Sequence, residues 1–97
     1  TGVRIIGRDI LDGFARRHHT ARAPLEAWVL LMGNKSFRHF PDLKQLFPRA
    51  DYVKPRTVFN IGGNKYRLIT TVDYGLQSVV IKEALTHEEY DREGWKK

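Results

Sequence analysis

The feature that most constrains the fold is a run of three strand-like segments between residues 57 and 85, joined by two short turns. Each segment is rich in β-branched and aromatic residues, which favour strands. The segments are Thr57–Ile61, Lys65–Val72 and Gln77–Leu85. Gly62-Gly63 predicts a two-residue turn of the primed type, and residues 73–75 predict the second turn. Strands joined by turns this short pair antiparallel. The chain therefore predicts a small twisted antiparallel sheet.

Side chains of a strand alternate between two faces. The apolar residues of each predicted strand occupy alternate positions and would share one face. We expect a helix-covered face that holds Phe59, Ile61, Tyr66, Leu68, Val79, Ile81 and Leu85. The opposite face then holds Asn60, Lys65, Arg67, Val80, Lys82 and Ala84. Small residues beside three cations predict a shallow, positively charged floor. An ordinary solvated sheet face also carries lysine and arginine, so alternation alone leaves both interpretations open.

A helix start directly after the third strand adds titratable groups. Thr86 and Glu89 have the spacing of a capping box, which predicts that a helix begins here. His87 and Tyr90 are three residues apart and share a helix face. We expect both to lean over the floor beside Lys82. Three interpretations of Trp95, in the short tail, stay open: stacking on a base, packing back on the domain, or fraying in the free protein.

The first half of the chain predicts the helices that cover the sheet. Val3–Ile6 is a candidate first strand, followed by a helix with Asp9 as N-cap and an apolar stripe of Ile10, Leu11, Phe14 and Ala15. Thr20 is the expected cap of a second helix that reaches Met32, with Trp28 in its core-facing stripe. A short third helix is expected to hold Leu43, Leu46 and Phe47.

Composition limits the remaining possibilities. The 97 residues suffice for one small domain, residues 1–97, with a single core. A net charge of +6 favours a polyanionic or acidic partner. The chain has no cysteine, and the adjacent His18 and His19 would not face each other on a helix, so they are read as cations at a helix end rather than as metal ligands. We expect no metal and no cofactor.

Targeting signals are not apparent. No apolar run is long enough to span a bilayer and no secretory pattern is seen. The absence of cysteine fits a reducing cytoplasm, and we expect a cytoplasmic protein. The chain starts at Thr1-Gly2 and its one methionine is Met32. We therefore expect that an initiator was removed or that the first residues are a cloning remnant.

The stretch VFNIGGNKYRL, followed by a third strand and THEEYD, resembles the HigB toxins of bacterial toxin–antitoxin modules. DLKQLFPRAD at Asp42–Asp51 and the RII start with its two helices are also similar to that family. The resemblance spans Arg4 to Asp91. It implies the α+β fold of the RelE-like superfamily, in which two N-terminal helices pack on one face of a small twisted antiparallel sheet. We expect a short C-terminal helix as well.

The same resemblance implies an activity and partners. HigB toxins are ribosome-dependent mRNA interferases that cut translated mRNA in the A site, without a metal, by attack of the ribose 2′-OH. A helix-turn-helix antitoxin neutralises them. On this reading the catalytic residues are Arg67, His87, Tyr90, Lys65 and Lys82. The expected RNA-binding residues are Asn60, Lys54, Arg56, Lys65 and Arg67. We assign phosphorane stabilisation to Arg67 and proton transfer to His87, with Tyr90 as substrate-orienting or proton-transferring residue.

Three acids surround the expected proton-transfer group: Glu88, Glu89 and Asp91. Acids in the first turn of a helix suit its dipole, so we interpret them as structural and pointing away. The alternative, that one of them acts on His87, stays open. Two further functions also stay open: a non-catalytic RNA- or ribosome-binding module, and an inactive RelE-like domain that only binds its antitoxin. A metal-dependent nuclease is disfavoured, because the acids cluster in one helix.

Overall fold

In the computed structural model, which describes residues 2–92 and 94–96, the strands form a five-stranded sheet in the order β1-β5-β4-β3-β2. Thr1, one of the two residues of the expected cloning remnant, lies outside the described residues. The strands are β1 (Arg4–Ile6), β2 (Asp51–Val53), β3 (Arg56–Ile61), β4 (Tyr66–Asp73) and β5 (Ser78–Thr86). The helices are α1 (Arg8–Arg17), α2 (Arg22–Gly33), α3 (Phe40–Leu46) and α4 (His87–Asp91), with 3₁₀ turns η1 (His19–Ala21) and η2 (Gly94–Lys96).

The sheet is mixed. Strands β2 to β5 pair antiparallel, in line with the short turns between them. Strand β1 pairs with β5 in parallel, with Ile5 opposite Val79. Short turns determine the direction of neighbouring strands only, and β1 has a partner that is distant in the sequence. The predicted α+β class, with a short C-terminal helix, is confirmed.

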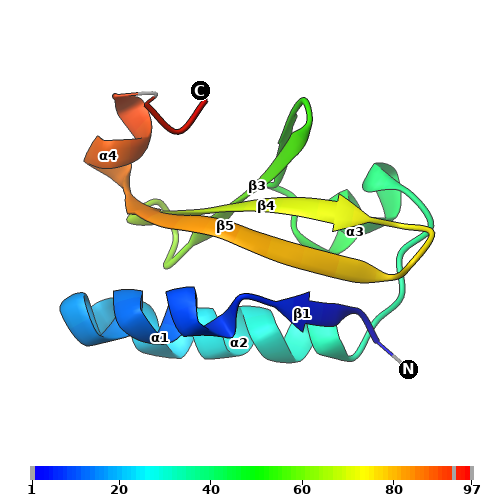
Figure 1. Ribbon diagram of the computed structural model, residues 1–97, viewed down its shortest axis with the longest axis horizontal. Helices are drawn as coiled ribbons and strands as arrows, with labels where there is room; N and C mark the ends of the chain where they lie inside the picture. The colour runs from blue at the N-terminus through cyan, green and yellow to red at the C-terminus, as the bar shows by residue number, and fades with distance from the viewer. Residues whose placement is uncertain (1, 93, 97) are drawn as a thin grey trace.

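Helices α1 and α2 lie along one side of the sheet, while α4 lies on the other (Figure 1). The main core fills the space between these two helices and the sheet. Trp28 of α2 is 2% exposed and meets Phe59 of β3 edge to face, with 5.3 Å between ring centroids. Burial of side chains of this size contributes about 1.5–3 kcal/mol each. The prediction that Trp28 is a core residue is confirmed.

Both predicted N-caps of the first two helices are wrong. Gly7 precedes α1 with φ 99° and no side-chain cap, and Asp9 lies within the first turn. A Cβ at Gly7 would lie 3.1 Å from the Ile81 carbonyl oxygen, so close packing and positive φ both favour glycine there. Thr20 lies in η1 rather than at the start of α2, and its hydroxyl hydrogen-bonds the Tyr66 hydroxyl.

A β-bulge reverses the alternation near the end of β5. Ile81 pairs with Thr70 and Glu83 with Ile69, which leaves Lys82 without a ladder partner. An extra residue in one strand moves the following side chains to the other face. Ala84 therefore pairs with Leu68 on the helix-covered face and Leu85 with Arg67 on the opposite face. The predicted faces of Ala84 and Leu85 are both wrong for this reason.

Candidate active site

The face of the sheet opposite α1 and α2 carries a second, smaller apolar cluster. Its buried members are Val58, Ile69 and Trp95, and partly buried Val53, Leu85 and Tyr90 pack against them. The expected open, shallow cationic floor is therefore wrong. The bulge brings Leu85 onto this face, and the chain after α4 returns to cover it. The candidate site lies at the margin of this cluster, where β4, β5 and α4 meet.

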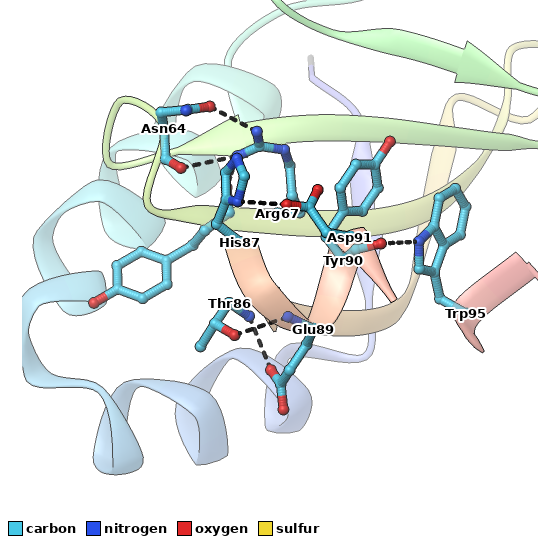
Figure 2. A network of polar contacts seen from close by, with 9 residues as sticks. Asn64, Arg67, Thr86, His87, Glu89, Tyr90, Asp91 and Trp95 are labelled. Atoms are coloured by element: carbon cyan, nitrogen blue, oxygen red, sulfur yellow. Dashed lines mark hydrogen bonds and ion pairs between the residues drawn. The ribbon is translucent and has the colours of Figure 1, made fainter. Parts of the chain in front are cut away.

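Arg67 is the polar centre of this region. It lies in β4, the middle strand of the sheet, and is 8% exposed. It stands opposite Asn60 of β3 and Leu85 of β5. One terminal guanidinium nitrogen donates to the carbonyl oxygens of Asn64 (3.2 Å) and Tyr66 (3.1 Å), and the other donates to Asn64 Oδ1 at 2.6 Å (Figure 2). Within the described residues, these bonds engage three of the five N–H groups of the side chain.

Asn64 is a member of this site that the sequence reading missed. It lies in the turn between β3 and β4, where Gly62 and Gly63 both have positive φ as predicted. The turn is longer than predicted, however, because Ile61 pairs with Tyr66 and residues 62–65 connect them. An asparagine beside two glycines is typical of a turn residue, and that ordinary role concealed its contact with Arg67.

One aromatic ring covers Arg67, and a second ring stacks on the first. The guanidinium carbon lies 5.3 Å from the centroid of the Tyr90 ring, within the range of a cation–π contact. The Trp95 indole stacks on Tyr90 at 4.9 Å and 14°, and its Nε1 donates to the Tyr90 carbonyl oxygen at 3.0 Å. Of the three interpretations of Trp95, the structure shows the one in which it packs back on the domain.

The start of α4 holds His87 beside the β3–β4 turn. The predicted capping box is present: the Thr86 N–H donates to Glu89 Oε1 (2.9 Å) and the Glu89 N–H to Thr86 Oγ1 (3.2 Å). The backbone N–H of His87 donates to the carbonyl oxygen of Lys65 at 2.9 Å. The His87 side chain is 40% exposed, and its Nδ1 lies 3.0 Å from Asp91 Oδ2 (Figure 2). The ring is thus anchored and accessible.

The other basic residues singled out from the sequence lie on different turns and strands. Lys65 is exposed and belongs to the turn, next to the backbone of His87. Lys82 is exposed in the bulge, and its side chain makes no hydrogen bond or ion pair with the rest of the described chain. Lys54 and Arg56 lie at the β2–β3 hairpin. Arg56 precedes Asn60 by four residues, which is roughly 13 Å along a strand.

A hollow of about 390 Å³ adjoins Asn60. Its lining includes Phe47, Arg49 and Gly63 as well as Asn60, whose side chain is half-buried. The amide of Asn60 thus borders a space next to the β3–β4 turn that carries Asn64 and Lys65.

Two of the other histidines contact neighbouring side chains, while His19 is exposed. The His18 ring packs on Phe14, with 4.4 Å between centroids, and His39 lies 3.7 Å from Asp42. In the described part of the chain, no group of three or more histidine, aspartate or glutamate side chains is arranged to hold a metal ion. Among these residues there is also no helix of sufficient length and apolarity to cross a membrane.

Comparison with known proteins identifies relatives of the chain. Residues 21–93 match the family of HigB toxins, described as the RelE-like toxic component of a toxin–antitoxin system. The chain is 30% identical over 92 residues to a protein of Escherichia coli strain K12 named mRNA interferase toxin HigB, with 92% of this chain and 88% of the relative covered. A Shigella flexneri protein named mRNA interferase HigB matches with the same identity and coverage.

Proposed function

Because the chain belongs to the HigB family of RelE-like toxic components of toxin–antitoxin systems, we propose that it is an mRNA interferase that cuts translated mRNA in the ribosomal A site. The observation that carries this proposal is the exposed imidazole of His87, anchored next to Lys65 and close in sequence to the Tyr90 that covers Arg67. Phosphodiester cleavage needs a group that exchanges protons and cations that bind the phosphate, and α4 and the neighbouring turn carry both kinds of residue.

The proposed reaction uses the RNA's own 2′-hydroxyl. A bond forms between the 2′-oxygen and phosphorus, and the bond from phosphorus to the 5′-oxygen breaks. The 2′-proton leaves to a base and the 5′-oxygen receives a proton from an acid, which yields a 2′,3′-cyclic phosphate and a 5′-hydroxyl. His87 exchanges one of these two protons, since histidine alone titrates near neutrality without perturbation. The proposed step needs no metal.

Charge that develops on the phosphate is stabilised by Lys65 and Arg67. Lys65 is exposed and free to meet a phosphate, and Arg67 has two N–H groups beyond the three bound to the turn. Tyr90 keeps the guanidinium plane in place through its ring. Asn60 positions ribose or base by hydrogen bonds, next to the hollow that it borders. Lys82, Lys54 and Arg56 meet phosphates further along the RNA.

The partners in this proposal are the ribosome with its mRNA, and an antitoxin of the helix-turn-helix type that blocks the toxin in the cytoplasm. The net charge of +6 supports a polyanionic partner. The membership in a toxin–antitoxin family supports the antitoxin.

The test is a translation reaction with a defined mRNA, with the 5′ ends mapped before and after addition of the protein. We expect new 5′-hydroxyl ends within the reading frame, and only when the message is being translated. Translation arrest without new ends would instead favour the non-catalytic ribosome-binding module. Absence of both effects would favour a domain that only binds its antitoxin.

A further inference from the structure

We propose that Asp91 is a positioning residue for His87: its carboxylate holds the proton of Nδ1 and leaves Nε2 as the nitrogen that exchanges a proton with RNA. This inference rests on the proposed function. It is carried by the 3.0 Å separation between His87 Nδ1 and Asp91 Oδ2. It also assigns a chemical role to a group that the sequence reading had interpreted as structural.

The three acids of α4 differ in what they contact. Glu89 uses its carboxylate for the backbone N–H of Thr86. Glu88 is adjacent to His87 in sequence, and side chains one residue apart on a helix do not face each other. Asp91 is one helical turn further on and reaches the ring. Only Asp91 is therefore in the position to orient the imidazole.

Helix electrostatics does not account for Asp91. Glu88 and Glu89 lie in the first turn of α4, where the dipole favours negative charge. Asp91 is the last residue of the helix, where the same dipole disfavours it. The interpretation of all three acids as first-turn residues that point away is thus wrong for Asp91. Its contact with His87 gives the carboxylate a different physical role.

The donors and acceptors of the two side chains determine which nitrogen of His87 carries the proton. A neutral imidazole has one N–H, and an ionised carboxylate only accepts. The proton must then be on Nδ1, so the lone pair of Nε2 is available to a 2′-hydroxyl. When His87 is protonated, Nδ1–H remains with Asp91 and Nε2–H is the donor for the leaving 5′-oxygen. In both states Asp91 assigns the exchange to Nε2.

The backbone on which this pair is mounted is held in place. The capping box fixes the first turn of α4, and the His87 N–H is bound to Lys65 at the turn. Side-chain exposures of 40% and 61% leave the pair accessible to a large substrate. Exposed ion pairs contribute little to stability, so Asp91 can be replaced without loss of the fold.

The first test observes the tautomer directly in the free protein. ¹⁵N NMR of histidine-labelled protein distinguishes the protonated nitrogen of a neutral imidazole, and a His87→Gln variant assigns the signal among the four histidines. We expect His87 to carry its proton on Nδ1, and Asp91→Ala to shift the population toward Nε2–H. Glu88→Ala, which removes the same charge from the same helix, is expected to leave the tautomer unchanged. An unchanged tautomer in Asp91→Ala would overturn the proposed contact.

The second test measures cleavage of translated mRNA by the same variants. We expect Asp91→Ala to lower kcat roughly tenfold with KM unchanged, as for other residues that orient a reactive group. Asp91→Asn should recover part of the rate, because its amide oxygen still accepts from Nδ1–H. A shifted tautomer at full cleavage rate would overturn the positioning role alone. A wild-type protein that has the expected tautomer but cleaves no RNA would overturn the proposed function and, with it, the catalytic meaning of the contact.

Discussion

The ring of Tyr90 lies over the guanidinium of Arg67, with 5.3 Å from the Arg67 Cζ to the ring centroid. Arg67 is thereby enclosed by α4 on one side and by its own turn on the other. A residue expected from its pattern to be a free phosphate ligand is also a structural element of the fold. Its substitution should therefore affect stability and activity together.

Arg67→Ala should abolish cleavage and lower the free energy of unfolding by about 1–3 kcal/mol, since the oxygens of Asn64 and Tyr66 lose a charged donor. Urea denaturation and the cleavage assay measure the two effects. Lys82→Ala is the matched control: an exposed cation without a bonded partner in the described chain should change stability by less than about 0.5 kcal/mol. Equal stability of the two variants would refute the structural role of Arg67.

Two substitutions of Tyr90 distinguish the role of its ring from the role of its hydroxyl. Tyr90→Phe keeps the ring that covers Arg67 and should retain stability and most of the cleavage rate. Tyr90→Ala removes the ring from Arg67 and from Trp95 and should reduce both. Loss of cleavage in a stable Tyr90→Phe protein would instead indicate that the hydroxyl takes part in proton transfer.

Thr86→Ala tests the importance of the capping box. Loss of an N-cap side chain costs about 1 kcal/mol, and a frayed α4 would release His87 from the Lys65 carbonyl. We expect a lower denaturation midpoint and a slower cleavage rate, with both restored by Thr86→Ser. A cleavage rate that stays unchanged in Thr86→Ala while the denaturation midpoint falls would show that activity does not depend on the capped first turn of α4.

Tyr74 provides a pH-dependent prediction away from the site. Burial raises the pKa of the Tyr74 phenol above its ordinary value, with smaller contributions from Tyr52 and Asp42. The raised pKa stabilises the fold below the unfolded value of about 10, and this stabilisation is lost as the pH rises above it. Tyr74→Phe should therefore lose less stability in alkali than the wild type, as followed by circular dichroism.

The same substitution should be tolerated near neutral pH. Among the residues that the structure describes, the buried hydroxyl of Tyr74 has no hydrogen-bond partner, so its removal should leave the unfolding free energy unchanged or raise it by roughly 1 kcal/mol. A marked loss of stability would mean that the hydroxyl is satisfied in solution.

Local signals in the sequence were sufficient for part of this structure. The spacing of Thr86 and Glu89 predicted the start of α4, because a capping box is complete within four residues. The Gly62-Gly63 pair predicted a turn of the primed type, in which residues adopt positive φ, because two adjacent residues suffice to indicate such a turn. The stripe that contains Trp28 predicted the buried side of α2.

The alternation of strand side chains could not predict the position at which a bulge interrupts it. Nothing in the residues around Lys82 marks a bulge, and one extra residue exchanged the faces of Ala84 and Leu85. The stacking of Trp95 on Tyr90 depends on how the chain returns after α4, which no local pattern specifies. The contact between Asn64 and Arg67 likewise arises from the geometry of the turn rather than from a motif.

Proton transfer by His87 in mRNA cleavage is tested most directly by 5′-end mapping of a translated mRNA with wild-type and His87→Ala proteins of equal denaturation midpoint. We expect new 5′-hydroxyl ends, paired with 2′,3′-cyclic phosphates, for the wild type and a loss of at least about a hundredfold in their rate of formation for the variant. Equal cleavage by both proteins would contradict it.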